Sequence, residues 1–183
     1  MTHQNASFLP QLGEDDKLTP VMIYTGNKMV WGLVFSKIAI RVSTWLFSDM
    51  APTYMKIYDA NLLMVGGSKR PIPVKHQIMH LLTRGISAFH LMPPFSEGVD
   101  YDPEETNRKF VPVSAYIGYF RFDGFVRITE ISTIDNFLAA AKSEYIPLYD
   151  CRMDCPLEPS IKGIKAPMVL LHQTQVTFSC NEP

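Results

Sequence analysis

Two aspartates stand in matching local sequence at distant places in the chain. Asp59 lies in "YMKIYDA" (54–60), and Asp150 lies in "YIPLYDC" (145–151). If the fold brought these carboxylates together, they could exchange a proton with a substrate or hold a cation. The alternative is that each aspartate accepts backbone hydrogen bonds at a bend in its own strand, and we favour this structural role. The pair is kept as a candidate carboxylate site.

Soft metal ligands are few in this chain. The candidates are Cys151, Cys155, Cys180 and His172. Zinc sites use four such ligands, often in C-x2-C spacing, whereas the first two cysteines follow C-x3-C in a segment that favours a strand. Their sulfurs would then lie about 13 Å apart along the strand. We therefore expect buried cysteines that pack as small apolar side chains, and no metal.

Two further patterns approach a metal site without completing one. His76 and His80 are four residues apart, but "PIPVKHQIMHLL" is typical of an extended segment, and no glutamate of an H-E-x-x-H motif stands between them. Asp100, Asp102 and Glu104 alternate as at the start of a calcium loop, but the glycine needed at the sixth position is absent. No phosphate-binding glycine loop or nucleophile motif occurs either, so no cofactor is expected and an enzyme is disfavoured.

Two strands with contrasting faces are the best candidates for binding. The segment "MVWGLVF" (29–35) alternates so that one face is wholly apolar. The segment "RFDGFVR" (121–127) places charged and aromatic side chains at the same alternate positions. The first face is either buried within the protein or binds a partner. The candidate interaction residues are Met29, Trp31, Leu33, Phe35, Arg121, Asp123, Phe125 and Arg127.

These two segments belong to a longer internal similarity. Residues 20–46 and 112–138 share seven identities at an offset of 92, and residues 54–60 and 145–151 share three at an offset of 91. Chance matching at ordinary amino-acid usage gives about two identities over this length. The sequence therefore predicts an internal duplication. Its predicted parts are an N-terminal tail (1–18), a first unit (19–92), a linker loop (93–110) and a second unit (111–183).

Each unit has the pattern of a small bent sheet. Alternation predicts strands, a glycine inside the second strand (Gly32 or Gly124) predicts a bulge, and "STIDNFLAAAKS" (132–143) predicts a helix capped by Ser132 or Thr133. The order is β-β-α-β-β-β in both units. The fold class is therefore α+β, mainly β. Two small bent sheets or partly open barrels are expected to pack about a pseudo-twofold axis, because units of about 70 residues have little core of their own.

Composition narrows the class of protein further. Apolar residues make up 46% of the 183 and charged residues 19%, with a net charge of -1. A soluble globular chain fits this balance, whereas a nucleic-acid binder usually has a basic excess. No apolar run spans a bilayer, no signal peptide pattern opens the chain, and three cysteines favour a reducing compartment. We expect a cytoplasmic protein without membrane insertion.

The sequence pattern of the two units resembles that of small uncharacterised bacterial β-rich domains. The shared pattern is V-x-I/V-x-T, then apolar-x-G-x-V, then R-x-S-x-x-L, then apolar-x-D-A, found here from Val21 to Ala60. The second unit keeps Gly124, Val126, Leu138 and Asp150 but has Thr133 in place of Arg41 and Asp135 in place of Ser43. The resemblance covers about 40 residues of each unit and implies no activity. The short strands also loosely resemble Sm-like or SH3-like barrels, although no signature of either family is present.

The sequence favours a non-enzymatic protein–protein interaction or assembly module. Its partner would be a second copy of itself, as a homo-oligomer, or another protein. One alternative is a small-barrel nucleic-acid binder, which needs a basic face from residues such as Arg121, Arg127, Arg152, Lys162 and Lys165. The other alternative is a small-molecule enzyme or sensor that uses a cleft between the units, near the two aspartates.

Overall fold

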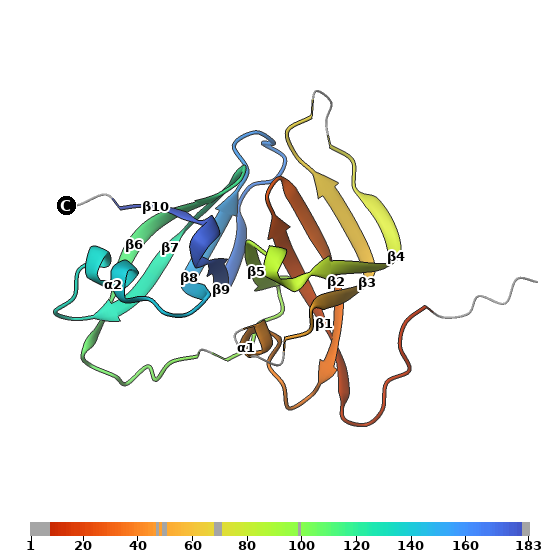
Figure 1. The fold of residues 1–183 in the computed structure, drawn as a ribbon, viewed down its shortest axis with the longest axis horizontal. Coiled ribbons are helices and arrows are strands. Elements are labelled where there is room, and N and C mark those ends of the chain that lie inside the picture. The colour runs from red at the N-terminus through yellow and green to blue at the C-terminus, as the bar shows by residue number, and fades with distance from the viewer. Residues whose placement is uncertain (1–7, 47, 49–50, 68–70, 99, 181–183) are drawn as a thin grey trace, which may run out of the picture.

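The protein is mainly β, and its strands form one continuous antiparallel sheet (Figure 1). The computed structural model describes residues 8–46, 48, 51–67, 71–98 and 100–180. Within them, ten strands follow the order β10-β6-β7-β8-β9-β5-β1-β2-β3-β4. The parts of the predicted tail (1–7) and of the predicted second unit (181–183) lie outside the described residues.

The first half of the sheet (residues 16–91) is built as the sequence predicts. Its elements are β1 (Asp16–Thr25), β2 (Lys28–Lys37), α1 (Val42–Leu46), β3 (Tyr54–Met64), β4 (Val74–Leu82), a 3-10 turn η1 (Thr83–Gly85) and β5 (Ala88–Leu91). β1 begins at Asp16, within the segment predicted as tail, because Asp16 to Thr25 pair without interruption with Lys37 to Lys28 of β2.

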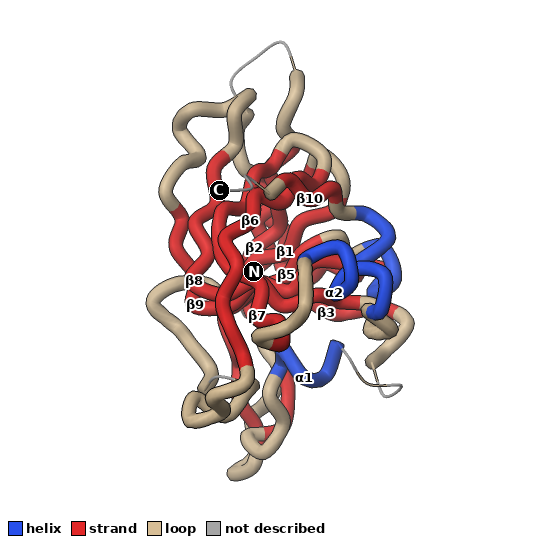
Figure 2. Tube along the Cα trace, turned by 90° about the vertical axis from the view of Figure 1, so that its left-hand side faces the viewer, coloured by secondary structure: helices blue, strands red, loops and turns tan. Residues whose placement is uncertain are grey.

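The second half (residues 108–179) has the same elements in the same order. They are β6 (Arg108–Ile117), β7 (Phe120–Thr129), α2 (Ile134–Ala140), β8 (Tyr145–Asp154), β9 (Ile164–His172), a 3-10 turn η2 (Gln173–Gln175) and β10 (Thr177–Ser179). The predicted order β-β-α-β-β-β is therefore observed in both halves. Both α-helices are short and lie outside the strands, which make up the body of the molecule (Figure 2).

The predicted bends at the two strand glycines are present. The β2–β3 register shifts between Trp31 and Leu33, and the β7–β8 register shifts between Asp123 and Phe125. A Cβ on Gly124 would lie 2.7 Å from the carbonyl oxygen of Tyr149, and Gly32 faces the corresponding carbonyl at the same distance. Since this contact is with backbone, only glycine lets the neighbouring strand approach so closely.

The two halves join through unlike strands, which corrects the expected packing. β5 of the first half pairs with β9 of the second, with Ala88 opposite Leu171 and Phe89 opposite Leu170. Among the described strands, the reciprocal pair that a twofold axis would require, β10 with β4, is not formed. The prediction of two separate sheets was therefore wrong. Backbone pairing at two free edges merges them head to tail into one sheet.

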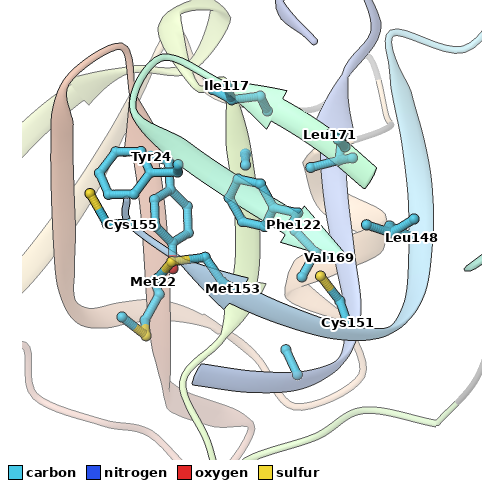
Figure 3. Close-up of a cluster of buried hydrophobic side chains, with 14 of the residues drawn as sticks. Met22, Tyr24, Ile117, Phe122, Leu148, Cys151, Met153, Cys155, Val169 and Leu171 are labelled. Carbon is cyan, nitrogen blue, oxygen red and sulfur yellow. The ribbon is translucent and has the colours of Figure 1, made fainter. Parts of the chain in front are cut away.

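The core of the second half is completed by residues from the first. Tyr24 of β1 is fully buried and packs edge to face against Phe120 and Phe122 of β7, at centroid distances of 4.9 and 5.1 Å. Figure 3 shows Tyr24 and Phe122 within this cluster. Met22 and Met29 join the same cluster. A second cluster fills the first half and includes Tyr145 of β8. Each half therefore contributes side chains to the other's core.

The described part of the predicted linker runs between the halves, and its last residues, 108–110, already belong to β6. We call residues 93–98 and 100–107 the strap. Glu97 accepts hydrogen bonds from the Val42 backbone N–H (2.9 Å) and the Ser43 hydroxyl (2.5 Å), at the start of α1. Further along, Asp100 accepts a hydrogen bond from the Tyr149 hydroxyl of β8 at 2.7 Å. These bonds satisfy donors at the helix start and fix the path of the strap between the halves.

The predicted helix of the second half is confirmed, with its cap. Thr133 precedes α2 in an extended conformation, and its side-chain oxygen accepts a hydrogen bond from the Asn136 backbone N–H. This is the usual way to satisfy a free donor in the first turn. At seven residues, α2 is the longer of the two helices, and no helix among the described residues is long and apolar enough to cross a bilayer.

Candidate interaction edges

The two aspartates take up a backbone role rather than a shared site. Asp59 and Asp150 both have positive φ, 47° and 46°, where the residue forms the bulge of its strand. Both are exposed. The strands that carry them, β3 and β8, are separated in the sheet by four others. The geometry therefore favours the structural interpretation, in which aspartate tolerates a left-handed conformation that most residues avoid.

Asp150 does border a pocket. This pocket has a volume of about 520 Å³ and lies between the strap and strands β8 and β9. Asp59 is not among its lining residues, whereas Arg152 and Lys165 are. The pocket thus offers one carboxylate and two cations to a small polar ligand. Among the described residues, Asp59 and Asp150 do not line a common pocket of those found.

The cysteines have the properties of core residues. Cys151 and Cys155 are 2% exposed, and burial raises the pKa of both thiols above the usual value. A raised pKa keeps a thiol protonated, which makes it a poor nucleophile and a poor metal ligand at neutral pH. Cys180 is half-buried and lies just after β10. The prediction that Cys151 and Cys155 pack in the core agrees with this burial.

The remaining metal candidates do not converge within the described residues. His76 and His80 lie on β4, exposed and four residues apart along one strand. Asp102 accepts a hydrogen bond from the backbone N–H of Glu104, as in an ordinary turn. Nowhere in the described chain do three or more potential metal-ligating side chains cluster.

His90 is a buried histidine whose two ring nitrogens are both engaged. Its Nε2 lies 2.9 Å from the Tyr24 hydroxyl, and its Nδ1 lies 2.8 Å from the Leu91 carbonyl oxygen. The carbonyl can only accept, so Nδ1 carries the proton and Nε2 accepts from the tyrosine. Burial lowers the pKa of His90 to about 4. The ring is therefore neutral near pH 7 and serves the core.

The apolar strand face of the first half is partly covered by the second half. Met29 is 5% exposed and belongs to the shared cluster, and Trp31 packs against that cluster. Leu33 and Phe35, further along β2, are half-buried. The sequence left two alternatives for this face, burial within the protein or binding of a partner. Met29 and Trp31 are covered within the protein.

The charged strand face of the second half is neutralised locally. Arg121 pairs with Asp123 at 2.9 Å. Arg127 pairs with Glu105 of the strap at 2.7 Å and lies 4.5 Å from the centre of the Tyr101 ring. Phe125 remains exposed between them. These pairs reduce the positive charge that this face could offer to phosphates, and they give Arg127 a structural task.

The most open feature of the sheet, not predicted from the sequence, is the outer edge of β4. β4 pairs with β3 on one side, and in the described chain no strand pairs with its other side. Around it lie five exposed apolar side chains, which we call the β4 patch: Tyr54, Met64, Ile72, Val74 and Ile78. An unpaired strand of nine residues is a template for pairing with another chain.

A short signal in the sequence pointed to this edge. In "PIPVKHQIMHLL" apolar and polar residues do not alternate cleanly. A strand with one buried face would show clean alternation. The opposite end of the sheet is also open, since β10 pairs only with β6 among the described strands.

Compared with models of protein families, with curated proteins and with solved structures, the chain finds no match.

Proposed function

We propose that this protein is a non-enzymatic assembly module, which joins protein chains by adding a strand to the edge of β4. The observation that carries the proposal is this uncovered edge together with the β4 patch. Strand addition draws its affinity from backbone hydrogen bonds and its specificity from side chains next to the edge. Both requirements are met by β4.

The proposal also includes the internal duplication. It is supported by matching features at equivalent places: Gly26 and Gly118 both have positive φ at the first turn of each half, and Asp59 and Asp150 share theirs in the third strand. Among the described strands, each half already pairs with the other half through one sheet edge and leaves its second edge open. The open edge can therefore pair with a further strand.

A substitution series on the β4 patch tests the proposal. Val74→Lys and Ile78→Lys place charge on exposed positions of the open strand, where it opposes the docking of another chain without disturbing the core. Ile131→Lys, at a site 96% exposed and outside the strands, is the matched control. Native mass spectrometry of the purified proteins should show complexes for the wild type and the control, and their loss in Ile78→Lys. Loss in Val74→Lys as well would show that the added strand spans the length of β4.

Other outcomes contradict the proposal directly. The wild-type protein could stay monomeric when purified, and its β4 amides could exchange hydrogen in cell extract as fast as those of an unpaired strand. These two results together would show that it is not an assembly module. A monomer that carries a small bound molecule would instead favour the second candidate, a small-ligand sensor or enzyme. For that candidate the specific observation is the pocket of about 520 Å³ beside Asp150.

A further inference from the structure

The strand pairing that joins the two halves suggests an equivalent pairing between two chains. β4 corresponds to β9, since both are the fourth strand of their half, and β10 corresponds to β5. Inside the chain, β9 pairs with β5. Among the described strands, β4 and β10 lack a partner on their outer sides. The two open edges are thus the same two kinds of edge that already join.

We propose that β10 of one chain pairs with β4 of a second copy, and that this repeats the internal β5–β9 junction head to tail. This deepens the assembly function proposed above and rests on it, because it names the partner as the same chain. An interface between unlike patches closes into a ring or extends as a filament, and it leaves no free edge within the assembly.

The correspondence of the strands fixes the register of this pairing. Tyr24 pairs with Ala88, and its counterpart Tyr116 pairs with Thr177, so Thr177 occupies the place of Ala88. On the other strand, Lys56 pairs with His80 while Pro147 pairs with Leu170, which makes Leu81 the counterpart of Leu171. Since Ala88 faces Leu171 inside the chain, Thr177 should face Leu81 of the next copy.

Burial separates the occupied junction from the open one. Leu170 and Leu171 of β9 are 1% and 0% exposed, whereas their counterparts His80 and Leu81 on β4 are exposed and half-buried. Ala88 of β5 is likewise fully buried, and its counterpart Thr177 is exposed. The compared residues occupy equivalent positions on equivalent strands. Their difference in exposure therefore reflects whether a neighbouring strand covers them.

The turns beside the junction also permit a second copy to approach. Inside the chain the two first turns touch so closely that a Cβ on Gly118 would lie 2.1 Å from the carbonyl oxygen of Gly26. In the proposed contact the roles exchange, and Gly26 of one copy takes the place of Gly118. Gly26 also lacks a Cβ, so no side chain at this position opposes the approach.

The contact between chains should be weaker than the internal one. Tyr24 packs against Phe120 and Phe122 inside the chain, but Tyr116 in its place would approach Lys28, and the other counterpart, Val30, is already fully buried in its own chain. Less apolar surface is then removed from water. We therefore expect an association that depends on protein concentration, whereas the two halves of one chain remain joined.

Disulfide trapping between two variants, each with one introduced cysteine on an edge strand, tests the proposal. Both carry Cys180→Ser, which removes the half-buried native thiol next to β10; Cys151 and Cys155 are buried. One variant has Thr177→Cys and the other Leu81→Cys. Residues that face each other across antiparallel strands lie about 4.5–5.5 Å apart between Cα atoms, within the range of a disulfide. The mixture should form a cross-linked dimer at least tenfold more than either variant alone.

The matched control pairs Thr177→Cys with Val74→Cys. Val74 lies on the same exposed strand, but about 23 Å from Leu81 along it, so this mixture should not cross-link. Far-ultraviolet circular dichroism of each variant checks that it is folded. Equal cross-linking in both mixtures would mean random collision and would overturn the proposed register.

Two other outcomes overturn the inference and are distinguishable from each other. Cross-linking of Leu81→Cys or of Val74→Cys with itself, without the mixed product, would show two β4 edges pairing symmetrically; the assembly function would stand and the head-to-tail contact would fall. An absence of all products, together with native mass spectra of wild-type monomer at every concentration, rejects self-assembly. Capture of a different protein on β4 would then retain the assembly function alone.

Discussion

Asp59 and Asp150 hold the same left-handed backbone conformation, with φ of 47° and 46°, at equivalent places in the third strand of each half. A carboxylate that serves chemistry has no need of this conformation, whereas a strand bulge does. The two residues mark where β3 and β8 leave regular pairing beside Gly32 and Gly124. The matching sequence around them thus reflects a repeated bend.

The first prediction concerns these aspartates. Asp59→Ala and Asp150→Ala should each lower the free energy of unfolding by about 1 kcal/mol, because a Cβ without a compensating polar group disfavours positive φ. Asp→Gly at either position should be neutral or slightly stabilising, and Asp→Asn should be close to neutral. Urea denaturation of the six variants measures this order. A stable Asp→Asn variant that loses binding of a ligand would instead restore the carboxylate site.

A second prediction concerns the glycine that lets β7 and β8 approach. Gly124→Ala should destabilise the fold by about 1–3 kcal/mol, since its methyl group would overlap the Tyr149 carbonyl oxygen and the Leu148 side chain. Gly85→Ala is the control, because no atom lies within 4 Å of its added Cβ and its φ is not positive. Thermal unfolding of both variants gives the comparison, and equal midpoints would refute the packing argument.

The buried histidine predicts a specific pH dependence. His90 has a pKa of about 4 in the fold against 6.5 when unfolded, so the unfolded chain binds the proton more readily. Stability from this residue is therefore complete above about pH 6.5 and is lost as the pH falls toward 4. Between pH 7 and 4.5 the wild type should lose roughly 2–3 kcal/mol more than His90→Gln.

Urea denaturation at both pH values checks this difference. The carboxylates contribute equally to both proteins, so the comparison isolates the histidine. Tyr24→Phe is a useful second variant, because it removes the hydroxyl that donates to Nε2 and leaves the aromatic packing in place. Identical acid sensitivity in wild type and His90→Gln would show that the ring is not held neutral by the core.

A fourth prediction concerns the strap. Glu97→Ala should cost about 1 kcal/mol and speed hydrogen exchange at Val42 and Ser43, because it removes the acceptor for both backbone N–H groups at the start of α1. Glu104→Ala, an exposed residue of the same strap, should leave both unchanged. Exchange measured by mass spectrometry distinguishes the two. No change at α1 in Glu97→Ala would contradict the capping role.

Much of the local structure could be read from the sequence, because its causes are local. The order of strands and helix in each half follows from alternation, the bends follow from Gly32 and Gly124, and the start of α2 follows from Thr133. Each of these depends on residues within a few positions of the feature itself. The sequence by itself therefore determined the elements, their order and the mainly-β class.

Only the tertiary structure decided how the halves meet. The edges of β4, β5, β9 and β10 present backbone N–H and C=O groups that are alike whatever the side chains, so no local pattern states which edge takes which partner. The same reason explains why the apolar residues of "MVWGLVF" were open to two interpretations. Burial of Met29 and Trp31 against the second half follows from the β5–β9 junction, and the openness of β4 follows from the absence of a described strand beside it.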